Sequence, residues 1–276
     1  MLQALPGTVP PSEPGRDRFS KTEEERLTDA VLKVRGITKS FGAFKAVDGV
    51  DLDIADGEIH ALIGPNGAGK TTFFNLLTGS LPLTAGEIRL RGEVISGLPM
   101  DAIARRGIVR SYQISSIFPE FTALANVRFA LQQKRPTNFD FWRAEASLES
   151  LHGRAMELLD HLGLSEWAWT RAGDLPYGRK RALEIATTLA LDPQVLLLDE
   201  PTSGMGREDI GRVVDLIRKV AVGRTVLMVE HNLSVVEGLC NQVTVLARGQ
   251  IIAGGTYQEV ARNEKVVEAY LGAAHA

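Results

Sequence analysis

The sequence has a single cysteine, no long apolar run and no excess of basic residues. One cysteine, Cys240, excludes an internal disulfide and a zinc site built from several cysteines, and it is typical of a reducing compartment. Because Cys240 lies in an apolar stretch, we expect a small core residue rather than a nucleophile. No apolar run approaches the roughly 18–20 residues needed to span a bilayer, and the first residues lack the apolar segment of a secretory signal. We therefore expect a soluble, cytoplasmic chain, unless a partner holds it at a membrane.

Charge and length narrow the class of protein further. The net charge is −3 at pH 7, which argues against general nucleic-acid binding, because that activity needs a basic surface. The densest basic cluster, Arg179-Lys180-Arg181, is interpreted as one solvated turn of a helix. A chain of 276 residues, of which 44% are hydrophobic, has room for one large α/β domain or for one domain plus a lobe.

The chain divides into an N-terminal extension and one domain over residues 29–276. Residues 1–28 hold several prolines and charges but few large apolar residues, so we predict a disordered extension. Residues about 115–175 are rich in Ala, Leu, Glu and Arg, and they predict an inserted helical lobe. Strands with alternating or nearly alternating polarity, typical of an antiparallel sheet, are expected at 31–34, 50–54 and 87–90.

Later segments have a different character. Residues 195–198 and 225–229 are continuous apolar runs, typical of parallel strands that are buried on both faces. Residues 263–272 predict a short amphipathic helix. The domain is therefore expected to contain a parallel sheet, an antiparallel sheet wrapped around a glycine-rich loop, and a helical lobe.

The glycine-rich loop is the strongest motif in the chain. Its spacing is glycine, four free positions and then Gly-Lys-Thr, which is the pattern of a phosphate-binding loop. It lies between an apolar, strand-like run at 59–63 and a helical run at 72–77. Glycines let the backbone aim N–H groups at an anion, and the helix N-terminus that follows favours negative charge. In this pattern Lys70 reaches the outer phosphates, and the Thr71 hydroxyl is placed to ligate Mg²⁺. The predicted phosphate contacts are Gly64, Pro65, Asn66, Gly67, Ala68, Gly69, Lys70, Thr71 and Thr72.

Two acids and a histidine follow the later apolar runs. Asp199 and Glu200 stand at the carboxyl end of a predicted buried strand, where α/β sheets bind ligands. Beside a phosphate loop, Asp199 can hold Mg²⁺ through its water shell, and Glu200 can orient or deprotonate a water that attacks the γ-phosphate. His231 ends the next strand and is either a sensor of the γ-phosphate or a satisfied structural histidine. Gln113 is a candidate to complete the Mg²⁺ and water shell from a mobile loop.

Together these motifs resemble the ATP-binding subunits of ABC transporters, over about residues 30 to 272. The resemblance implies a P-loop NTPase core with a mostly parallel sheet, an N-terminal antiparallel β-subdomain and an inserted helical subdomain. It implies ATP and Mg²⁺ as ligands, with Mg²⁺ near Thr71, Gln113 and Asp199. Phe41 corresponds to the adenine-stacking aromatic of the family, and a phenylalanine of the sheet core is the alternative.

The signature motif of the family, usually Leu-Ser-Gly-Gly-Gln, corresponds here to residues 175–179. In the family, two ATP-binding domains sandwich ATP, and each contributes its signature to the other's phosphate loop, a role that Pro176, Tyr177 and Gly178 would fill. Pro176 replaces the serine and has neither a hydroxyl nor an N–H to donate. The loop after Glu200 also departs from the family, because it reads Ser-Gly-Met-Gly where an aspartate is usual. We therefore expect a heterodimer with a second ATP-binding subunit, and a homodimer with two slow sites is the alternative.

Several segments look like the ATPases that import branched-chain amino acids. These are the Phe41–Val47 lead-in, the Tyr177-Gly178 signature, the long helical lobe and the tail at 266–272. The resemblance implies transmembrane permease subunits as partners, a solute-binding protein that acts indirectly, and a place at the cytoplasmic face of the membrane. A groove formed by Ile114–Phe118 and the helical lobe is expected to receive a permease helix. The alternatives are relatives that carry urea or short amides, the lipopolysaccharide-export ATPase, and ABC ATPases that act off the membrane.

Overall fold

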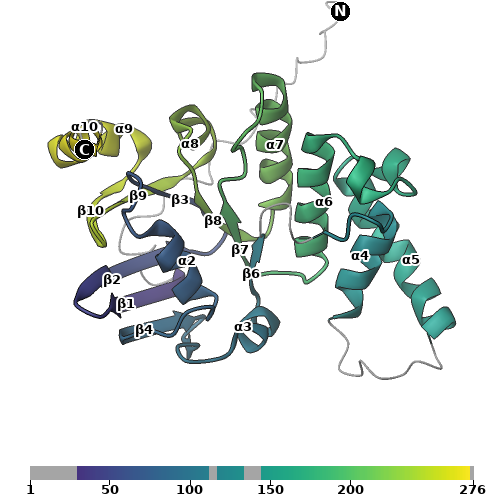
Figure 1. The fold of residues 1–276 in the computed structure, drawn as a ribbon, viewed down its shortest axis with the longest axis horizontal. Helices are drawn as coiled ribbons and strands as arrows, with labels where there is room; N and C mark the ends of the chain where they lie inside the picture. Colours follow the sequence, from purple (N-terminus) through teal and green to yellow (C-terminus); the bar gives the residue numbers. More distant parts are fainter. Residues whose placement is uncertain (1–29, 112–116, 134–143, 274–276) are drawn as a thin grey trace, which may run out of the picture.

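The computed structural model describes residues 30–111, 117–133 and 144–273 of the chain. Two sheets and the helices around them are arranged in layers, as Figure 1 shows. The predicted extension, residues 1–28, and the predicted ligand Gln113 lie outside the described residues.

The larger sheet has six strands in the order β10-β9-β3-β8-β7-β6. Its five neighbouring strands β9, β3, β8, β7 and β6 run parallel, and β10 pairs antiparallel with β9. The carboxyl ends of the parallel strands meet at one edge, so the loops after β3, β7 and β8 lie side by side. The strands are β3 (Ile59–Ile63), β6 (Ile108–Ser111), β7 (Val195–Asp199), β8 (Thr225–Val229), β9 (Gln242–Ala247) and β10 (Gln250–Gly255).

The smaller sheet is antiparallel and has the order β2-β1-β4-β5. Helix α2 (Lys70–Leu77) lies between the two sheets, and its Phe73 and Phe74 are completely buried among strands of both. Burial of two phenylalanines stabilises this layer by roughly 2–3 kcal/mol each relative to exposure. The strands are β1 (Ala30–Phe41), β2 (Phe44–Ala55), β4 (Ala85–Leu90) and β5 (Glu93–Val94).

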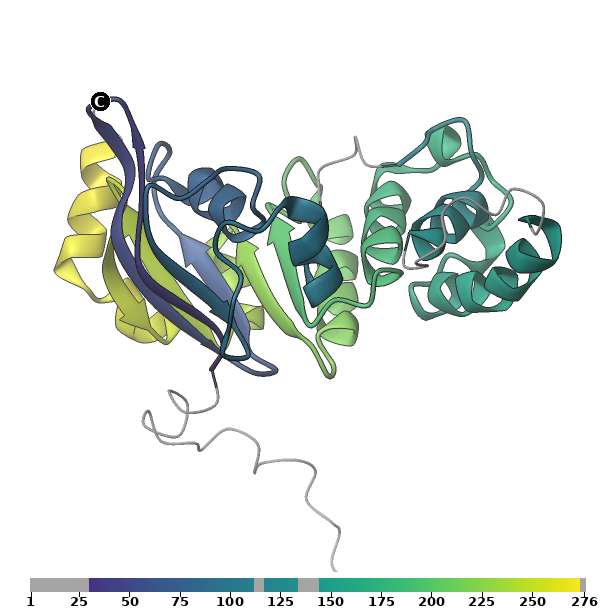
Figure 2. The same cartoon turned by 90° about the horizontal axis from the view of Figure 1, so that it is seen from below.

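The two faces of β7 show why a continuous apolar run forms a central strand. Val195 and Leu197 pack in the layer of α2, whereas Leu196 and Leu198 pack in the layer of α7 (Arg207–Val220). Side chains of a strand alternate between faces, so a strand covered on both sides needs apolar residues at every position. On the α7 side lie also α6 (Tyr177–Leu189) and α8 (Leu233–Leu239), as Figures 1 and 2 show.

A helical cluster lies beyond α6, at the end of the molecule opposite the C-terminal helices (Figures 1 and 2). It is joined to α6 through one continuous apolar cluster that includes Leu124, Leu159 and Leu183. Its elements are α4 (Ala123–Gln132), α5 (Ala144–His161) and the short 3-10 turns η3 (Ser165–Trp167) and η4 (Ala172–Asp174). The remaining helices are α3 (Met100–Arg106), α9 (Tyr257–Ala261) and α10 (Glu264–Ala273).

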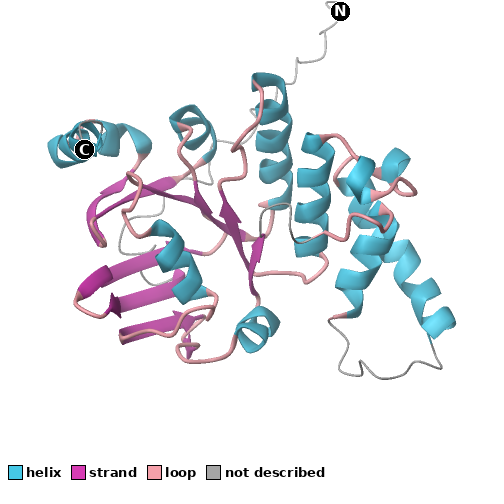
Figure 3. Cartoon of the chain, viewed as in Figure 1, coloured by secondary structure: helices cyan, strands magenta, loops and turns pink. Residues whose placement is uncertain are grey.

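The predicted α/β fold class, both predicted sheets and the tail helix are confirmed (Figure 3). Cys240 is half-buried, and its Sγ lies 3.5 Å from Sδ of Met228, which agrees with a packing role. One expectation about the basic cluster is wrong, because Arg181 is only 4% exposed. Helix α6 turns Arg181 toward the sheet, where it pairs with the buried carboxylate of Glu184.

In the part of the chain that the structure describes, no helix combines the length and the apolar character that crossing a bilayer requires.

Candidate functional site

The phosphate loop follows β3, one of the two middle strands of the larger sheet, and ends at the start of α2. Two of its glycines are required by close approach to neighbouring backbone. A Cβ at Gly64 would lie 2.0 Å from the Leu246 carbonyl oxygen, and one at Gly69 would lie 2.3 Å from the Ala46 carbonyl oxygen. Any larger residue would push the loop away from β9 and β2. Gly69 also adopts a left-handed conformation, with φ of 104°, as the residue that precedes α2.

Lys70 is folded back onto its own loop. Its Nζ donates to the Gly64 carbonyl at 2.6 Å and to the Pro65 carbonyl at 3.0 Å. Partial burial lowers the pKa of Lys70, and the negative charges of Glu200 and Asp199 oppose that shift. Lys70 is also the first residue of α2, so an anion bound at the loop would meet both the lysine and the helix N-terminus.

Asp199 ends β7 and is held by a residue that the sequence did not single out. Arg110, near the end of β6, forms a buried ion pair with Oδ2 of Asp199 and donates to Oδ1 of Asn75 in α2 at 2.6 Å. The guanidinium also lies 5.5 Å from the ring centroid of Phe74. One arginine thus links β6, β7 and the helix of the phosphate loop.

Thr71 and Asp199 fit the ligand set of a magnesium–nucleotide complex. Among the described residues, no group of three or more His, Cys, Asp or Glu is arranged to hold a metal ion. Mg²⁺ keeps several waters and usually binds through one or two protein groups plus substrate phosphates. Thr71 in α2 and Asp199 at the end of β7 provide such a pair, and Arg110 links Asp199 to Asn75 in the same helix.

Glu200 has an unusual backbone. Its φ is 45°, in the left-handed region that non-glycine residues rarely adopt. Its N–H donates to the Val229 carbonyl at 2.9 Å, and its carbonyl accepts from the N–H of Ser203 at 3.1 Å. Such a conformation persists only where the surroundings hold it. Those bonds turn the chain sharply after β7 and place Glu200 at the shared edge of the sheet.

His231 is mostly exposed, and the residue before it is the buried one. The His231 side chain is 63% exposed, and its Nδ1 lies 3.7 Å from Oε2 of Glu230. Glu230 accepts from the N–H of His231 at 2.7 Å, from that of Asn232 at 3.0 Å and from that of Thr202 at 3.1 Å. This carboxylate joins the loop after β7 to the loop after β8. The sequence signal for Glu230 was its place at a strand end beside His231, although the residue pattern pointed to the histidine alone.

The signature segment forms the first turn of α6. Pro176 precedes the helix without a side-chain cap, and its carbonyl accepts from the N–H groups of Arg179 and Lys180 at 2.9 Å. The Tyr177 hydroxyl donates to the Ser203 carbonyl at 3.1 Å, in the loop after Glu200. Gly178 lies close to α7, because a Cβ there would be 3.3 Å from Oδ1 of Asp209.

Phe41 lies at the end of β1, in the hairpin with β2, and half of its surface is exposed. Lys39 Nζ lies 5.2 Å from the centroid of its ring. A stacking surface is therefore available, and the role of Phe41 toward adenine stays a prediction.

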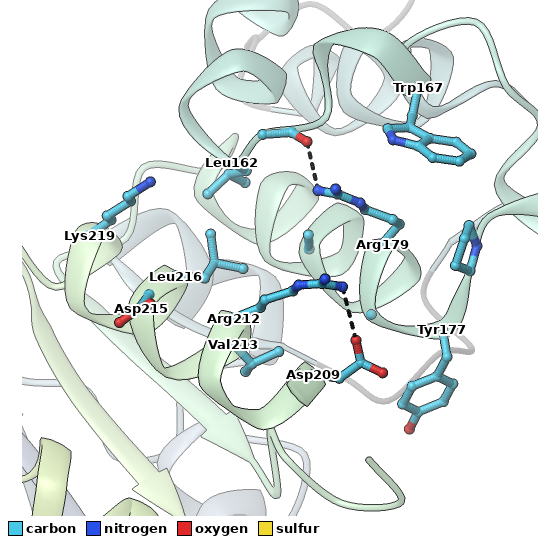
Figure 4. Close-up of a pocket in the computed structure, with 14 residues that line it drawn as sticks. Leu162, Trp167, Tyr177, Arg179, Asp209, Arg212, Val213, Asp215, Leu216 and Lys219 are labelled. Atoms are coloured by element: carbon cyan, nitrogen blue, oxygen red, sulfur yellow. Dashed lines mark hydrogen bonds and ion pairs between the residues drawn. The ribbon is translucent and has the colours of Figure 1, made fainter. Parts of the chain in front are cut away.

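A groove of about 580 Å³ runs beside the start of α6 (Figure 4). It separates α6 and the Gly163 turn from α7. On the upper wall Arg179 donates to the Gly163 carbonyl at 2.8 Å. On the lower wall Nη1 of Arg212 lies 3.5 Å from Oδ1 of Asp209. The signature turn therefore has open space on one side and the loop after Glu200 on the other.

A second groove, also of about 580 Å³, opens between α3, β6, α4 and α6. Phe118 stands at its wall with its ring centroid 5.0 Å from that of Phe129, in an edge-on arrangement. The two rings remain 43% and 40% exposed. Of the groove-forming stretch predicted at Ile114–Phe118, residues 114–116 lie outside the described residues.

Known proteins are similar to this chain in sequence. The family model described as "ABC transporter" matches residues 47–203, and the one described as "Branched-chain amino acid ATP-binding cassette transporter" matches residues 250–276. The high-affinity branched-chain amino acid transport ATP-binding protein BraF of Pseudomonas aeruginosa is 40% identical over 256 residues, which cover 90% of this chain and 100% of BraF.

Two solved structures are similar in fold. The ADP conformation of an ATP-binding cassette of an ABC transporter superposes with a TM-score of 0.77 and 28% identity, over 88% of this chain and 99% of that one. The dimeric structure of a bacterial ABC transporter cassette superposes with a TM-score of 0.69 and 25% identity, over 82% of this chain and 98% of that one.

Proposed function

The chain belongs to the ABC transporter family, and we propose that it is the ATP-hydrolysing subunit of an importer of branched-chain amino acids or a related small solute. The observation that carries the proposal is the meeting of the phosphate loop after β3 with Asp199 and Glu200 after β7 at one edge of the sheet, where Arg110 joins Asp199 to Asn75 in α2. The similarity to BraF and the C-terminal match to branched-chain amino acid transporters support the class of solute.

In the proposed mechanism the phosphates of ATP bind between the loop and the first turn of α2. Lys70 leaves the carbonyls of Gly64 and Pro65 and pairs with the outer phosphates, whose negative charge favours the ammonium form that burial disfavours. Thr71 and Asp199 hold Mg²⁺, with Gln113 as a further predicted ligand. When bound, Mg²⁺ neutralises charge that develops on the phosphates during transfer.

Glu200 orients or deprotonates the attacking water, and His231 contacts the γ-phosphate. The exposed imidazole of His231 leaves it able to reach a ligand, while Glu230 holds its backbone in place. Because the γ-phosphate bridges the loops after β3, β7 and β8, its loss removes one partner from each. Adenine stacks on Phe41 in this proposal.

Two surfaces of the chain, the signature turn and the groove beside Phe118 and Phe129, are the proposed contacts with partner subunits. Pro176, Tyr177 and Gly178 contact ATP bound to the phosphate loop of a second ATP-binding subunit, and the missing hydroxyl at Pro176 favours a heterodimer. The groove beside Phe118 and Phe129 receives a short helix of a permease, which holds the chain at the cytoplasmic face of the membrane. A solute-binding protein acts only through the permease.

A paired measurement tests the proposal. We expect Lys70→Ala to abolish binding of a fluorescent ATP analogue, because the outer phosphates lose their positive partner. Glu200→Gln should bind the analogue normally and release phosphate about 10²–10⁴-fold more slowly, which is the scale of a lost general base. If both variants hydrolyse Mg-ATP at the wild-type rate, the site is not the one described here.

A further inference from the structure

The strained backbone of Glu200 is flanked by two bonds from one helix. The carbonyl of Asp199 is the group directly before Glu200, and the carbonyl of Ser203 lies three residues after it. Both accept a hydrogen bond from a side chain of α6, the helix that begins with the signature segment. A left-handed non-glycine residue costs roughly 1–2 kcal/mol, so its neighbours must hold it.

Arg181 supplies the first bond. Its Nη2 donates to the Asp199 carbonyl at 3.0 Å, and its Nη1 donates to Oε2 of Glu184 at 2.6 Å. Arg181 is 4% exposed and Glu184 is completely buried. Burial raises the pKa of Glu184, and the adjacent Arg181 opposes that shift. The ion pair therefore fixes the guanidinium in one orientation, with a second arm directed at the Asp199 carbonyl.

Tyr177 supplies the second bond. Its hydroxyl donates to the Ser203 carbonyl, and the Ser203 N–H in turn donates to the carbonyl of Glu200. Tyr177 is 44% exposed and lies beside the groove of Figure 4, so this contact is reached from the surface of the signature turn. The first two turns of α6 thus hold the chain on both sides of Glu200.

We propose that Tyr177 and Arg181 are positioning residues that hold Glu200 in its hydrolytic conformation and connect it to the signature helix of the same subunit. The inference rests on the proposed function, in which Glu200 acts on water and the signature turn contacts ATP in the partner subunit. A shift of α6 caused by ATP in the partner's site then moves the two donors on either side of Glu200. In this way each site reports its occupancy to the carboxylate of the other.

The test uses the full-length chain, purified with its partner subunits through an affinity tag. The first variant, Tyr177→Phe, removes only a hydroxyl. The second, Arg181→Gln combined with Glu184→Gln, removes the donor without leaving a buried charge unpaired. We expect each to lower kcat about 10-fold while the Kd of a fluorescent ATP analogue stays within about twofold, because a misplacement near 1 Å can cost about 100-fold in rate.

A control variant separates positioning from general damage to the helix. Lys180→Gln removes one positive charge at the position before Arg181 in α6. It should keep kcat within about twofold of wild type, with rates normalised to the nucleotide bound per chain.

The outcomes are distinguishable. Wild-type kcat in both test variants would overturn the positioning role, as would an equal loss in the Lys180→Gln control. A change in Kd without a change in kcat would assign Tyr177 to nucleotide binding instead. If the wild-type complex releases no phosphate, or if Glu200→Gln is as fast as wild type, the proposed function fails and this inference fails with it.

Discussion

The Arg110 guanidinium forms a buried ion pair with Asp199, the carboxylate proposed to hold Mg²⁺. The side chains are 7% and 17% exposed, so little water screens the pair. Arg110 also reaches Asn75 in the helix of the phosphate loop. Before a nucleotide binds, the arginine thus supplies the positive charge that Asp199 requires at the end of β7.

Arg110→Gln should destabilise the protein by about 2–4 kcal/mol, because it leaves a partly buried carboxylate without a counter-charge. Mg-ATP should recover part of this loss by binding the same carboxylate. Urea unfolding with and without Mg-ATP measures both effects. Arg105→Gln is the matched control, since its ion pair with Asp101 is exposed and should contribute less than about 1 kcal/mol. Equal effects of the two substitutions would contradict the prediction.

Pro176→Ser should raise the ATPase rate of the assembled transporter. Serine restores a hydroxyl and an N–H that can donate to the γ-phosphate bound by the partner subunit. Hydrogen bonds to charged groups contribute roughly 1.5–3 kcal/mol, which corresponds to about a ten- to hundredfold larger equilibrium constant for closing the dimer around ATP. Pro176→Ala restores the N–H alone and should recover only part of the gain. Serine at this N-cap also stabilises α6 by about 1 kcal/mol, so the rates are compared well below the melting temperature. An unchanged ATPase rate in both variants would contradict the prediction that Pro176 weakens the contact with the partner's γ-phosphate.

Phe129→Asp should abolish solute uptake while the isolated chain still binds ATP. The substitution places a charge in the aromatic wall of the groove proposed for the permease helix, where desolvating a carboxylate is unfavourable. Uptake into cells and nucleotide titration of the purified chain are the two measurements. Val222→Asp, at a position 75% exposed after α7, serves as the control. Normal uptake with Phe129→Asp would place the permease contact elsewhere.

The Cys240 thiol should react slowly with alkylating reagents in the folded protein. Burial raises its pKa from 9.0 to about 12, with further contributions from the charges of Glu230 and Glu58. At pH 8 we expect iodoacetamide to react about 100-fold or more slowly with the folded chain than with the urea-unfolded chain, since only the thiolate reacts. Similar rates in the two states would show an accessible thiolate.

The same shift predicts a dependence of stability on pH. The folded pKa of Cys240 is above the unfolded value, so its contribution is full below about pH 9 and is lost as the pH rises toward 12. Cys240→Ala should flatten the decline of the unfolding free energy between pH 9 and 11, measured by urea titration. A parallel decline in the variant would assign the effect to other groups.

Contiguous patterns were enough to predict much of the fold and the candidate site. The spacing from Gly64 to Lys70 predicts a phosphate-binding turn from a few adjacent residues. The apolar run before Asp199 predicts a strand that is covered on both faces. Both depend on local chemistry and on periodicity, which a linear sequence carries in full. The antiparallel strands and the tail helix were predictable for the same reason.

Contacts between distant residues were decided only by the tertiary structure. Arg181 looked like part of a solvated cluster, because nothing next to it in the chain reveals that α6 turns it toward the carbonyl of Asp199. Arg110 and Glu230 likewise acquire their partners when neighbouring strands of the sheet bring their ends together. The sequence specifies which groups are present, and the periodicity of its apolar residues predicts which positions are buried. Which buried charge meets which backbone group depends on how the layers pack, and packing is a property of the whole fold.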